Sequence, residues 1–346
     1  MPHATPFGAN TQHRLDNTPI PNKRRILVLG ASGFIGRHVV RMLAASDWAL
    51  PVAASHRAPV ELKIPLATVR LDATQPAALE QALQGIDGVV NCITGDSKTI
   101  IASASALFAA CSRLTPPPRI VHLSTMMVYG SQTGTVDESA ALHGDWDTYS
   151  AAKTEVEKMS RACGSVVHLR PGIVYGPESP IWTGRIGRWL LQHRLGDLGA
   201  AGLGYCNLVH IGDVVEAVSR ALCMPGIEGE AFNLSLPSSP TWNDYFRKFA
   251  AMLGTEFVPI SRNRLVLERY VLAPPLKMAE ILSPRLPFRW RPPEPIRPWL
   301  LRLCCHPLRL DSRKAERILG IEWISVDKGV REAAAWVLDR ERSEIA

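Results

Sequence analysis

The stretch Arg25-Ile-Leu-Val-Leu-Gly-Ala-Ser-Gly-Phe-Ile-Gly36 joins a continuous apolar run to three spaced glycines. The apolar run predicts a strand covered on both faces, and the residues that follow have helical spacing. Between strand and helix, Gly30 would make a tight turn, Gly33 would let the backbone approach a pyrophosphate, and Gly36 would let helix and strand pack closely. An ordinary glycine-rich turn explains the string alone, but its position favours a dinucleotide-binding loop.

The same alternation of strand and helix continues through the first half of the chain. Short apolar runs predict further strands over residues 50–54, 67–71, 88–92, 119–123 and 165–170. Helical spacing predicts helices over residues 35–45, 76–84, 98–112 and 148–162 and, farther on, 242–253 and 312–319. Repeated strand–helix–strand units favour an α/β fold of the Rossmann type, a doubly wound parallel sheet with right-handed crossovers.

The regular pattern degrades in the second half, where prolines and arginines become frequent. We expect a disordered leader over residues 1–22, a dinucleotide-binding domain over 23–176, and a smaller C-terminal substrate lobe. Residues 208–222 are expected to return to the first domain, so the lobe would comprise mostly residues 177–207 and 223–346.

Composition excludes several classes of protein. With 46% hydrophobic and 21% charged residues, the chain can bury a substantial core. It has no apolar run of the roughly 18 residues that a membrane-spanning helix needs, and its N-terminus lacks the apolar stretch of a secretory signal. Its seven cysteines are scattered without the spacing of a zinc site. We therefore expect a cytoplasmic protein with reduced thiols and no bound metal.

The end of the second expected strand bears on the choice between NAD and NADP. An NAD-selective site places an acid there, but this chain has Ser55-His56-Arg57, and Arg57 can pair with a 2′-phosphate. A solvated surface arginine is the alternative, but the missing acid favours NADP(H) over NAD(H). Asp72, after the third strand, could reach the adenine amino group or instead cap the helix that begins at Pro76.

Tyr149-Ser-Ala-Ala-Lys153 places a phenol and an ammonium on one face of a helix. Hydride transfer at a carbinol carbon needs a group that gives or takes the hydroxyl proton, and an unperturbed tyrosine, with a pKa of about 10, is a weak base. A neighbouring ammonium stabilises the phenolate and lowers its pKa, and Lys153 can also hold the nicotinamide ribose. A chance pair on a solvated helix is the alternative, so the spacing needs support from elsewhere.

Two further segments supply that support. Val121-His-Leu-Ser-Thr-Met-Met-Val-Tyr-Gly130 ends a buried strand in hydroxyls, and Arg170-Pro-Gly-Ile-Val-Tyr-Gly-Pro177 ends the next strand. Both fall at carboxyl ends of strands, where ligands bind in open α/β sheets. With the glycine loop and Tyr149-x-x-x-Lys153, they resemble the extended short-chain dehydrogenase/reductases, the NAD(P)-dependent epimerase/dehydratase family. The resemblance runs from about residue 25 to residue 336.

The resemblance implies an enzyme and a role for several residues. Thr125, four residues before the tyrosine of the Val-Tyr-Gly stretch, would hold the substrate oxygen beside Tyr149, with Ser124 next to it. The alternative for Thr125 is a strand-end hydroxyl that caps the backbone. The implied catalytic residues are Thr125, Tyr149 and Lys153. The expected cofactor contacts are Gly30, Ser32, Gly33, Phe34, Ile35, Gly36, Arg57, Asp72, Ala73, Ile93, Ser124, Tyr149, Lys153, Pro171 and Val174.

Some residues depart from the family pattern, and these departures limit the type of reaction that we expect. Met126-Met127 stand where sugar-nucleotide dehydratases of the family carry Asp-Glu, which argues against dehydration. The Arg170-Pro-Gly form is also found in ketone reductases and hydroxysteroid dehydrogenases. We therefore expect an oxidoreductase or epimerase that transfers hydride at a secondary alcohol or ketone. The substrate would be a nucleotide sugar or, alternatively, a lipophilic ketone or hydroxysteroid-like molecule.

The net charge of +7 is concentrated in one stretch. Residues 261–310 carry ten Lys and Arg against three Glu, interleaved with aromatic residues and nine prolines. This basic stretch could hold a diphosphate, face an anionic membrane, or simply be solvated. The prolines interrupt any long amphipathic helix, which favours a small-molecule pocket over peripheral membrane contact. No nucleic-acid-reading motif accompanies the charge, so no nucleic-acid partner is expected.

A second class of function is a non-catalytic dinucleotide-binding redox sensor. The intact Thr125, Tyr149 and Lys153 favour the enzyme, because a sensor has no need of a proton relay. The expected partner is a small-molecule substrate, and a homodimer is one option for assembly.

Overall fold

The computed structural model describes residues 23–56, 64, 66–261, 264, 275, 278, 296 and 298–345. The leader expected over residues 1–22 and Arg57 therefore lie outside the described residues, as does most of the basic stretch between residues 261 and 310.

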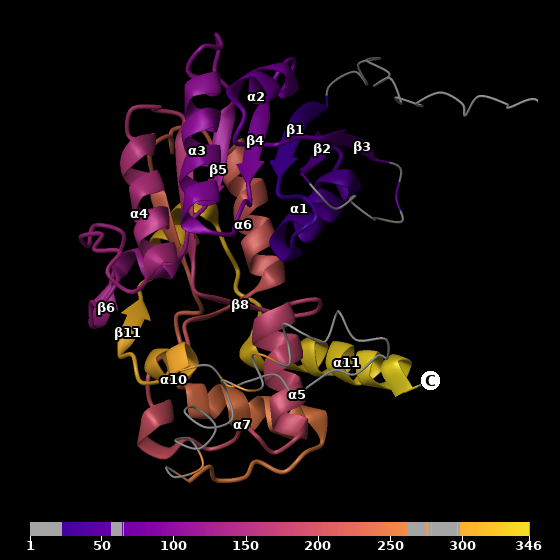
Figure 1. The fold of residues 1–346 in the computed structure, drawn as a ribbon, viewed down its shortest axis with the longest axis vertical. Coiled ribbons are helices and arrows are strands. Elements are labelled where there is room, and N and C mark those ends of the chain that lie inside the picture. The colour runs from indigo at the N-terminus through magenta and orange to yellow at the C-terminus, as the bar shows by residue number, and fades with distance from the viewer. Residues whose placement is uncertain are drawn as a thin grey trace, which may run out of the picture.

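A seven-stranded parallel sheet occupies one half of the molecule (Figure 1). Its strands are β1 (Arg24–Leu29), β2 (Ala49–Ser55), β3 (Ala67–Arg70), β4 (Gly88–Asn91), β5 (Arg119–Leu123), β7 (Val166–Pro171) and β10 (Ala231–Leu234). They lie in the order β10-β7-β5-β4-β1-β2-β3. The predicted Rossmann-type α/β fold is confirmed, and the strand order reverses between β1 and β4, the position where such sheets bind ligands.

Helices cover both faces of this sheet (Figure 1). The apolar residues of α1 (Phe34–Ala45) and α6 (Ile211–Cys223) pack on one face. Those of α2 (Pro76–Ala82), α3 (Ser97–Cys111) and α4 (Thr148–Ser160) pack on the other. The four helices predicted within the first half begin within one residue of these positions, because their apolar spacing matches the face that each buries.

The other half of the molecule is mostly helical (Figure 1). It contains α5 (Ile186–Leu191), α7 (Trp242–Leu253), α10 (Pro298–Cys304) and α11 (Val326–Ile345). Its core is rich in aromatic side chains, and α7 supplies four that are fully buried: Trp242, Tyr245, Phe246 and Phe249. Two small parallel sheets pair β8 (Ile173–Tyr175) with β9 (Leu208–His210) and β6 (Gly134–Val136) with β11 (Leu308–Leu310).

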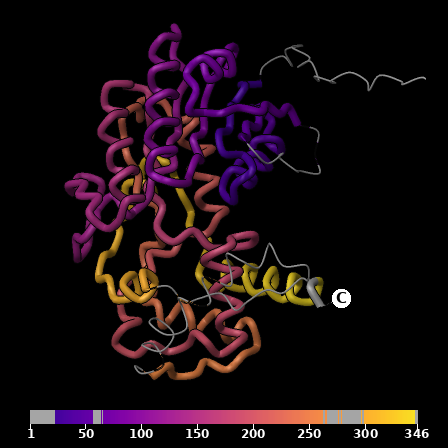
Figure 2. Tube along the Cα trace, viewed as in Figure 1, coloured from indigo at the N-terminus to yellow at the C-terminus, as the bar shows by residue number. Residues whose placement is uncertain are grey.

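The chain crosses between the two halves more than once, as the colours of Figure 2 show. Helix α6 packs against one face of the main sheet, whereas β9, which precedes it within residues 208–222, pairs with β8 outside that sheet. Strand β10 and the π-helical turn η6 (Ala315–Leu319) also pack with that sheet, although they lie within the range expected mostly for the lobe. A helix was predicted over residues 312–319, and the structure has the shorter η6, Ala315–Leu319, in its place. Among the described residues, no helix has the length and apolar character needed to cross a bilayer.

Candidate active site

The glycine loop connects β1 to α1 at the reversal of strand order. Gly30 has a φ of +74°, and a Cβ there would lie 3.0 Å from the carbonyl carbon and oxygen of Cys92 after β4. At Gly36, a Cβ would lie 2.3 Å from the carbonyl oxygen of Gly30. Only glycine therefore fits at either position, because the turn is left-handed at the first and the helix touches the turn at the second.

The start of α1 is shaped to receive an anion. Gly33 is its N-cap residue and no side chain caps the helix, so the first backbone N–H groups keep their capacity for a ligand. The nearest atom to a Cβ at Gly33 is the Gly30 oxygen, 3.2 Å away, and Gly33 itself is exposed. Ser32, Phe34 and Ile35 are half-buried around it. These features fit the pyrophosphate of a dinucleotide.

Tyr149 and Lys153 lie on the first turns of α4. Asp147 is the N-cap residue of this helix and its side chain accepts a hydrogen bond from the Ser150 backbone N–H at 2.8 Å, which fixes the start of the helix. Lys153 is only 1% exposed, and its Nζ donates to the carbonyl oxygens of Leu123 at 2.7 Å and Ile93 at 3.3 Å. These two bonds tie the helix to the carboxyl ends of β5 and β4.

Thr125 completes the group that the sequence predicted. Its Oγ1 accepts a hydrogen bond from the Met127 backbone N–H at 3.2 Å, so it caps the 3₁₀ turn η1 (Met126–Tyr129). The same side chain also interacts with the Tyr149 phenol and lowers its pKa. The capping interpretation of Thr125 is therefore confirmed, and its contact with a substrate oxygen stays a prediction.

The protonation states of the pair differ from the expectation. Burial raises the pKa of the Tyr149 phenol to about 12, although the interaction with Thr125 lowers it. The Lys153 ammonium lies 6.0 Å from the centre of the Tyr149 ring, and the expected lowering by this lysine is not seen. Burial also lowers the pKa of Lys153 to about 8. At neutral pH the tyrosine is thus a phenol and the lysine mostly an ammonium.

A buried ion pair that the sequence analysis did not single out lies behind this group. Glu157, one helical turn after Lys153, accepts hydrogen bonds from Arg170 Nη2 at 2.6 Å and Nε at 3.1 Å. The Ser124 hydroxyl donates to the same carboxylate. The only signal in the sequence was the continued four-residue spacing from Tyr149 through Lys153 to Glu157, which puts all three on one helix face.

The remaining expected cofactor contacts lie at strand ends or just beyond them. Asp72 and Ala73 follow β3, Ile93 follows β4, Pro171 ends β7, and Val174 lies on β8. Asp72 accepts hydrogen bonds from the Thr74 backbone N–H and hydroxyl at 3.0 and 2.8 Å. It does not cap α2, whose N-cap residue is Gln75, so its carboxylate is committed to a turn before that helix.

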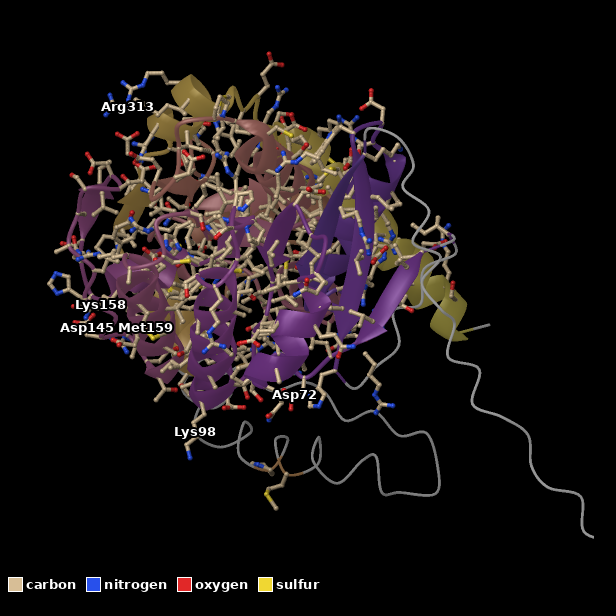
Figure 3. The ribbon with its side chains drawn as sticks, turned by 90° about the horizontal axis from the view of Figure 1, so that it is seen from above. Asp72, Lys98, Asp145, Lys158, Met159 and Arg313 are labelled. Atoms are coloured by element: carbon tan, nitrogen blue, oxygen red, sulfur yellow. The ribbon has the colours of Figure 1, made fainter. Side chains whose placement is uncertain are left out.

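A charged cavity of about 1180 Å³ opens on another side of the molecule. It is lined by Glu157, Arg170, Arg313 and Lys314, among others. In Figure 3, Arg313 lies on the opposite side of the molecule from Asp72. Lys314 pairs with Glu230 at 2.5 Å and Arg313 with Asp311, so much of the charge of this cavity is neutralised internally.

Comparison with known sequences identifies the family. Residues 26–235, from β1 to just after β10, match the NAD dependent epimerase/dehydratase family. The chain belongs to this family. The match covers the glycine loop, both strand-end segments and the Tyr149–Lys153 helix, so the family resemblance predicted from these motifs is confirmed, and with it an NAD(P)-dependent enzyme.

Individual relatives of the family differ in their substrates. The chain is 27% identical over 255 residues to 2′-dehydrokanamycin reductase of Streptomyces kanamyceticus, a match that covers 70% of each chain. It is 26% identical over 239 residues to 2-alkyl-3-oxoalkanoate reductase of Shewanella oneidensis, covering 60% of each. A crystal structure of UDP-glucuronic acid 4-epimerase from Bacillus cereus, with UDP-glucuronic acid and NAD, matches with a TM-score of 0.69 at 21% identity, over 91% of this chain and 99% of that one. This last likeness shows the fold alone.

Proposed function

We propose that this enzyme reduces a ketone to a secondary alcohol with NADP(H), using Thr125, Tyr149 and Lys153. The observation that carries the proposal is the arrangement of these three side chains. The Tyr149 phenol, whose pKa the Thr125 side chain lowers, stands one helical turn before a buried ammonium, and that ammonium is tied to the ends of β4 and β5. The glycine loop begins at the neighbouring strand end, within reach of a bound dinucleotide.

The roles follow from the chemistry of each side chain. The hydroxyl of Thr125 and the phenol of Tyr149 hold the carbonyl oxygen between them. When bound, the nicotinamide supplies the hydride for the carbonyl carbon. Tyr149 gives its proton to the oxygen, and the ammonium of Lys153 is proposed to hold the nicotinamide ribose. A proton from solvent then restores the phenol.

Reduction is favoured over oxidation by the protonation state of Tyr149. A pKa raised to about 12 by burial keeps the phenol protonated at neutral pH, which is the form that can donate to a ketone oxygen. Two of the matched relatives are named as reductases.

The preference for NADP(H) rests on the end of β2. The strand ends at Ser55, and no acid stands at Ser55, His56 or Arg57 to accept the ribose 2′-hydroxyl. Arg57 is proposed to pair with the 2′-phosphate. The structural neighbours were solved with NAD, so both cofactors belong in the test.

The proposal also assigns a different role to each half of the molecule. Residues 23–176, with 208–222, would bind the dinucleotide, and residues 177–207 with most of 223–346 would cover the nicotinamide and select a small-molecule substrate. We propose that the protein acts in the cytoplasm.

Redox-neutral epimerisation of a nucleotide sugar is the second candidate, because the same three side chains can serve hydride removal and return. Deuterium transfer separates the two. The enzyme is incubated with [4-²H]NADPH or [4-²H]NADH and a 3-oxoalkanoate panel, and separately with NADP⁺ or NAD⁺ and UDP-glucuronic acid. Reduction predicts consumption of cofactor and one deuterium at the new carbinol carbon. Epimerisation predicts a new sugar epimer without net consumption. Cofactor binding without either product would contradict both and favour a redox sensor.

A further inference from the structure

Lys153 carries its charge in a site that is closed to water. Its side chain is 1% exposed, and its Nζ donates hydrogen bonds to two neutral backbone carbonyls, those of Leu123 and Ile93. A buried ammonium in neutral surroundings tends to lose its proton, because desolvation disfavours the charged form. Lys153 therefore needs a negative charge nearby to remain a cation.

The titratable groups that face Lys153 come from three strands and its own helix. Burial raises the pKa of the Cys92 thiol, after β4, to about 12, so this group is neutral. Burial lowers the pKa of His122 on β5 well below its ordinary value and that of His168 on β7 to about 4, so both rings are neutral at pH 7. Tyr149 is a protonated phenol. Of these groups and Glu157, only Glu157 is negative.

Glu157 is kept ionised in spite of its burial. Burial alone would raise the pKa of its carboxyl, but hydrogen bonds and charge from Arg170 and the hydrogen bond from Ser124 outweigh it, so the pKa is held below its ordinary value. The side chain is 5% exposed and Arg170 also 5%. Arg170 is fixed in turn, because its Nη1 donates to the Tyr129 hydroxyl at 2.9 Å, and that hydroxyl donates to Asn233 at 2.7 Å.

We propose that Glu157 is a positioning residue of the active site: anchored by Arg170, its carboxylate holds the Ser124 hydroxyl at the end of β5 and supplies the counter-charge for Lys153. This inference rests on the proposed function, since it matters only if Lys153 and the Thr125 end of β5 take part in the reaction. Glu157 does not touch the substrate; it acts through its neighbours. Burial lowers the pKa of Lys153 to about 8, and charge interactions with Cys92 and Glu157 raise it in the opposite direction. Because the Cys92 thiol is neutral, with a pKa raised to about 12, Glu157 is the group of these two that carries a negative charge at neutral pH.

The test measures the titration of Lys153 in the full chain, without substrate. Protein is labelled with [ε-¹³C]lysine, and the signal of Lys153 is assigned by its loss in Lys153→Arg. The wild-type signal should titrate with a midpoint near 8. In Glu157→Gln, which keeps an acceptor for Ser124 but removes the charge, the midpoint should fall by about one pH unit or more. An unchanged midpoint in the folded variant would overturn the proposal.

Two further variants separate positioning from folding. Tyr129→Phe removes a hydrogen bond from the far side of Arg170 and is the matched control, because it disturbs the same buried network yet keeps the charge of Glu157. The stability of Tyr129→Phe should fall, while its Lys153 midpoint should stay that of the wild type. If its midpoint shifts as much as that of Glu157→Gln, loosening of the network rather than loss of the charge moves the midpoint. That result would contradict the proposal.

The double variant Glu157→Gln/Arg170→Met leaves no unpaired buried charge and so is expected to fold even where Glu157→Gln is strained. Because it also removes the positive charge of Arg170, its Lys153 midpoint should fall by less than that of Glu157→Gln, and an equal or larger fall would overturn the inference. The titration needs no turnover, so a negative titration result does not contradict the proposed reduction of a ketone. Likewise, failure to find a ketone substrate does not affect the titration result.

Discussion

Burial moves the pKa values of Tyr149 and Lys153 in opposite directions, to about 12 and about 8. Tyrosine is neutral when protonated and lysine is neutral when deprotonated, so removal from water favours a different form of each. The pairing of these residues could be predicted from their four-residue spacing and the motifs around them. Their protonation states could not, because burial depends on strands β4 and β5, which are distant in the sequence.

The pH dependence of reduction follows from these values. The active form has a protonated Tyr149 and a charged Lys153, so kcat/KM for ketone reduction should fall as the pH rises through about 8, where Lys153 loses its proton. In Lys153→Arg, whose guanidinium stays charged, the fall near pH 8 should disappear even if the overall rate is lower. A wild-type profile that stays level to pH 10 would contradict this assignment.

The contact of Arg57 with the 2′-phosphate is predicted from the sequence alone, since Arg57 lies outside the described residues. Replacement by alanine should weaken NADPH binding by about 1–3 kcal/mol, the scale of a charge-assisted hydrogen bond, and leave NADH binding almost unchanged. Fluorescence titration of both reduced cofactors measures this. Equal losses for the two would show that Arg57 does not contact the 2′-phosphate.

At the scale of elements, short apolar runs predicted six strands of the main sheet and the helices between them, because strands buried on both faces are mostly apolar. Edge strand β3 is the exception, since its residues alternate between half-buried and exposed. Strand β10 was not predicted. It is four residues long and contains Asn233, whose amide is buried and donates to the carbonyl of Asp311 at 3.1 Å. A polar residue satisfied by a distant segment cannot be distinguished from a loop residue in the sequence.

The glycine loop gives a prediction that separates binding from stability. Gly36→Ala places a Cβ 2.3 Å from the Gly30 oxygen, so it should destabilise the fold by about 1–3 kcal/mol, as overpacking does. Gly33→Ala meets only the Gly30 oxygen at 3.2 Å, so it should change stability by less than about 1 kcal/mol. Its methyl group would face the pyrophosphate and weaken NADPH binding. Chemical denaturation and cofactor titration measure the two effects, and unaltered binding in Gly33→Ala would count against the loop's role.

At the scale of the whole molecule, the motifs that identify the enzyme class lie in the half with the main sheet. The helical half is proposed to select the substrate. The main sheet carries the motifs, whereas the described residues of the helical half form an aromatic core around α7. This is why the fold and the enzyme class could be predicted and the substrate could not, and the roles of Thr125, Tyr149 and Lys153 stay a prediction. The basic stretch between residues 261 and 310 mostly lies outside the described residues, so its role remains a prediction.

If the basic stretch binds a diphosphate, UDP should bind with millimolar or better affinity, and the binding should weaken as salt is added. If it faces a membrane, anionic vesicles should bind the protein at about 1 kcal/mol per engaged basic residue, while UDP has no effect. We expect the first result, because the prolines interrupt a surface helix. Calorimetric titration with UDP beside vesicle sedimentation decides between them, and no response in either would indicate solvated arginines and a neutral ketone substrate.

The most direct test of the proton relay compares Tyr149→Phe with the wild type. The variant keeps the ring and loses only the hydroxyl that interacts with Thr125. NADPH affinity should stay within a few-fold, because the glycine loop is untouched. Turnover of the ketone should fall by about 10² or more, the scale of a lost general acid. Near-normal turnover in Tyr149→Phe would contradict the central claim that Tyr149 donates the proton.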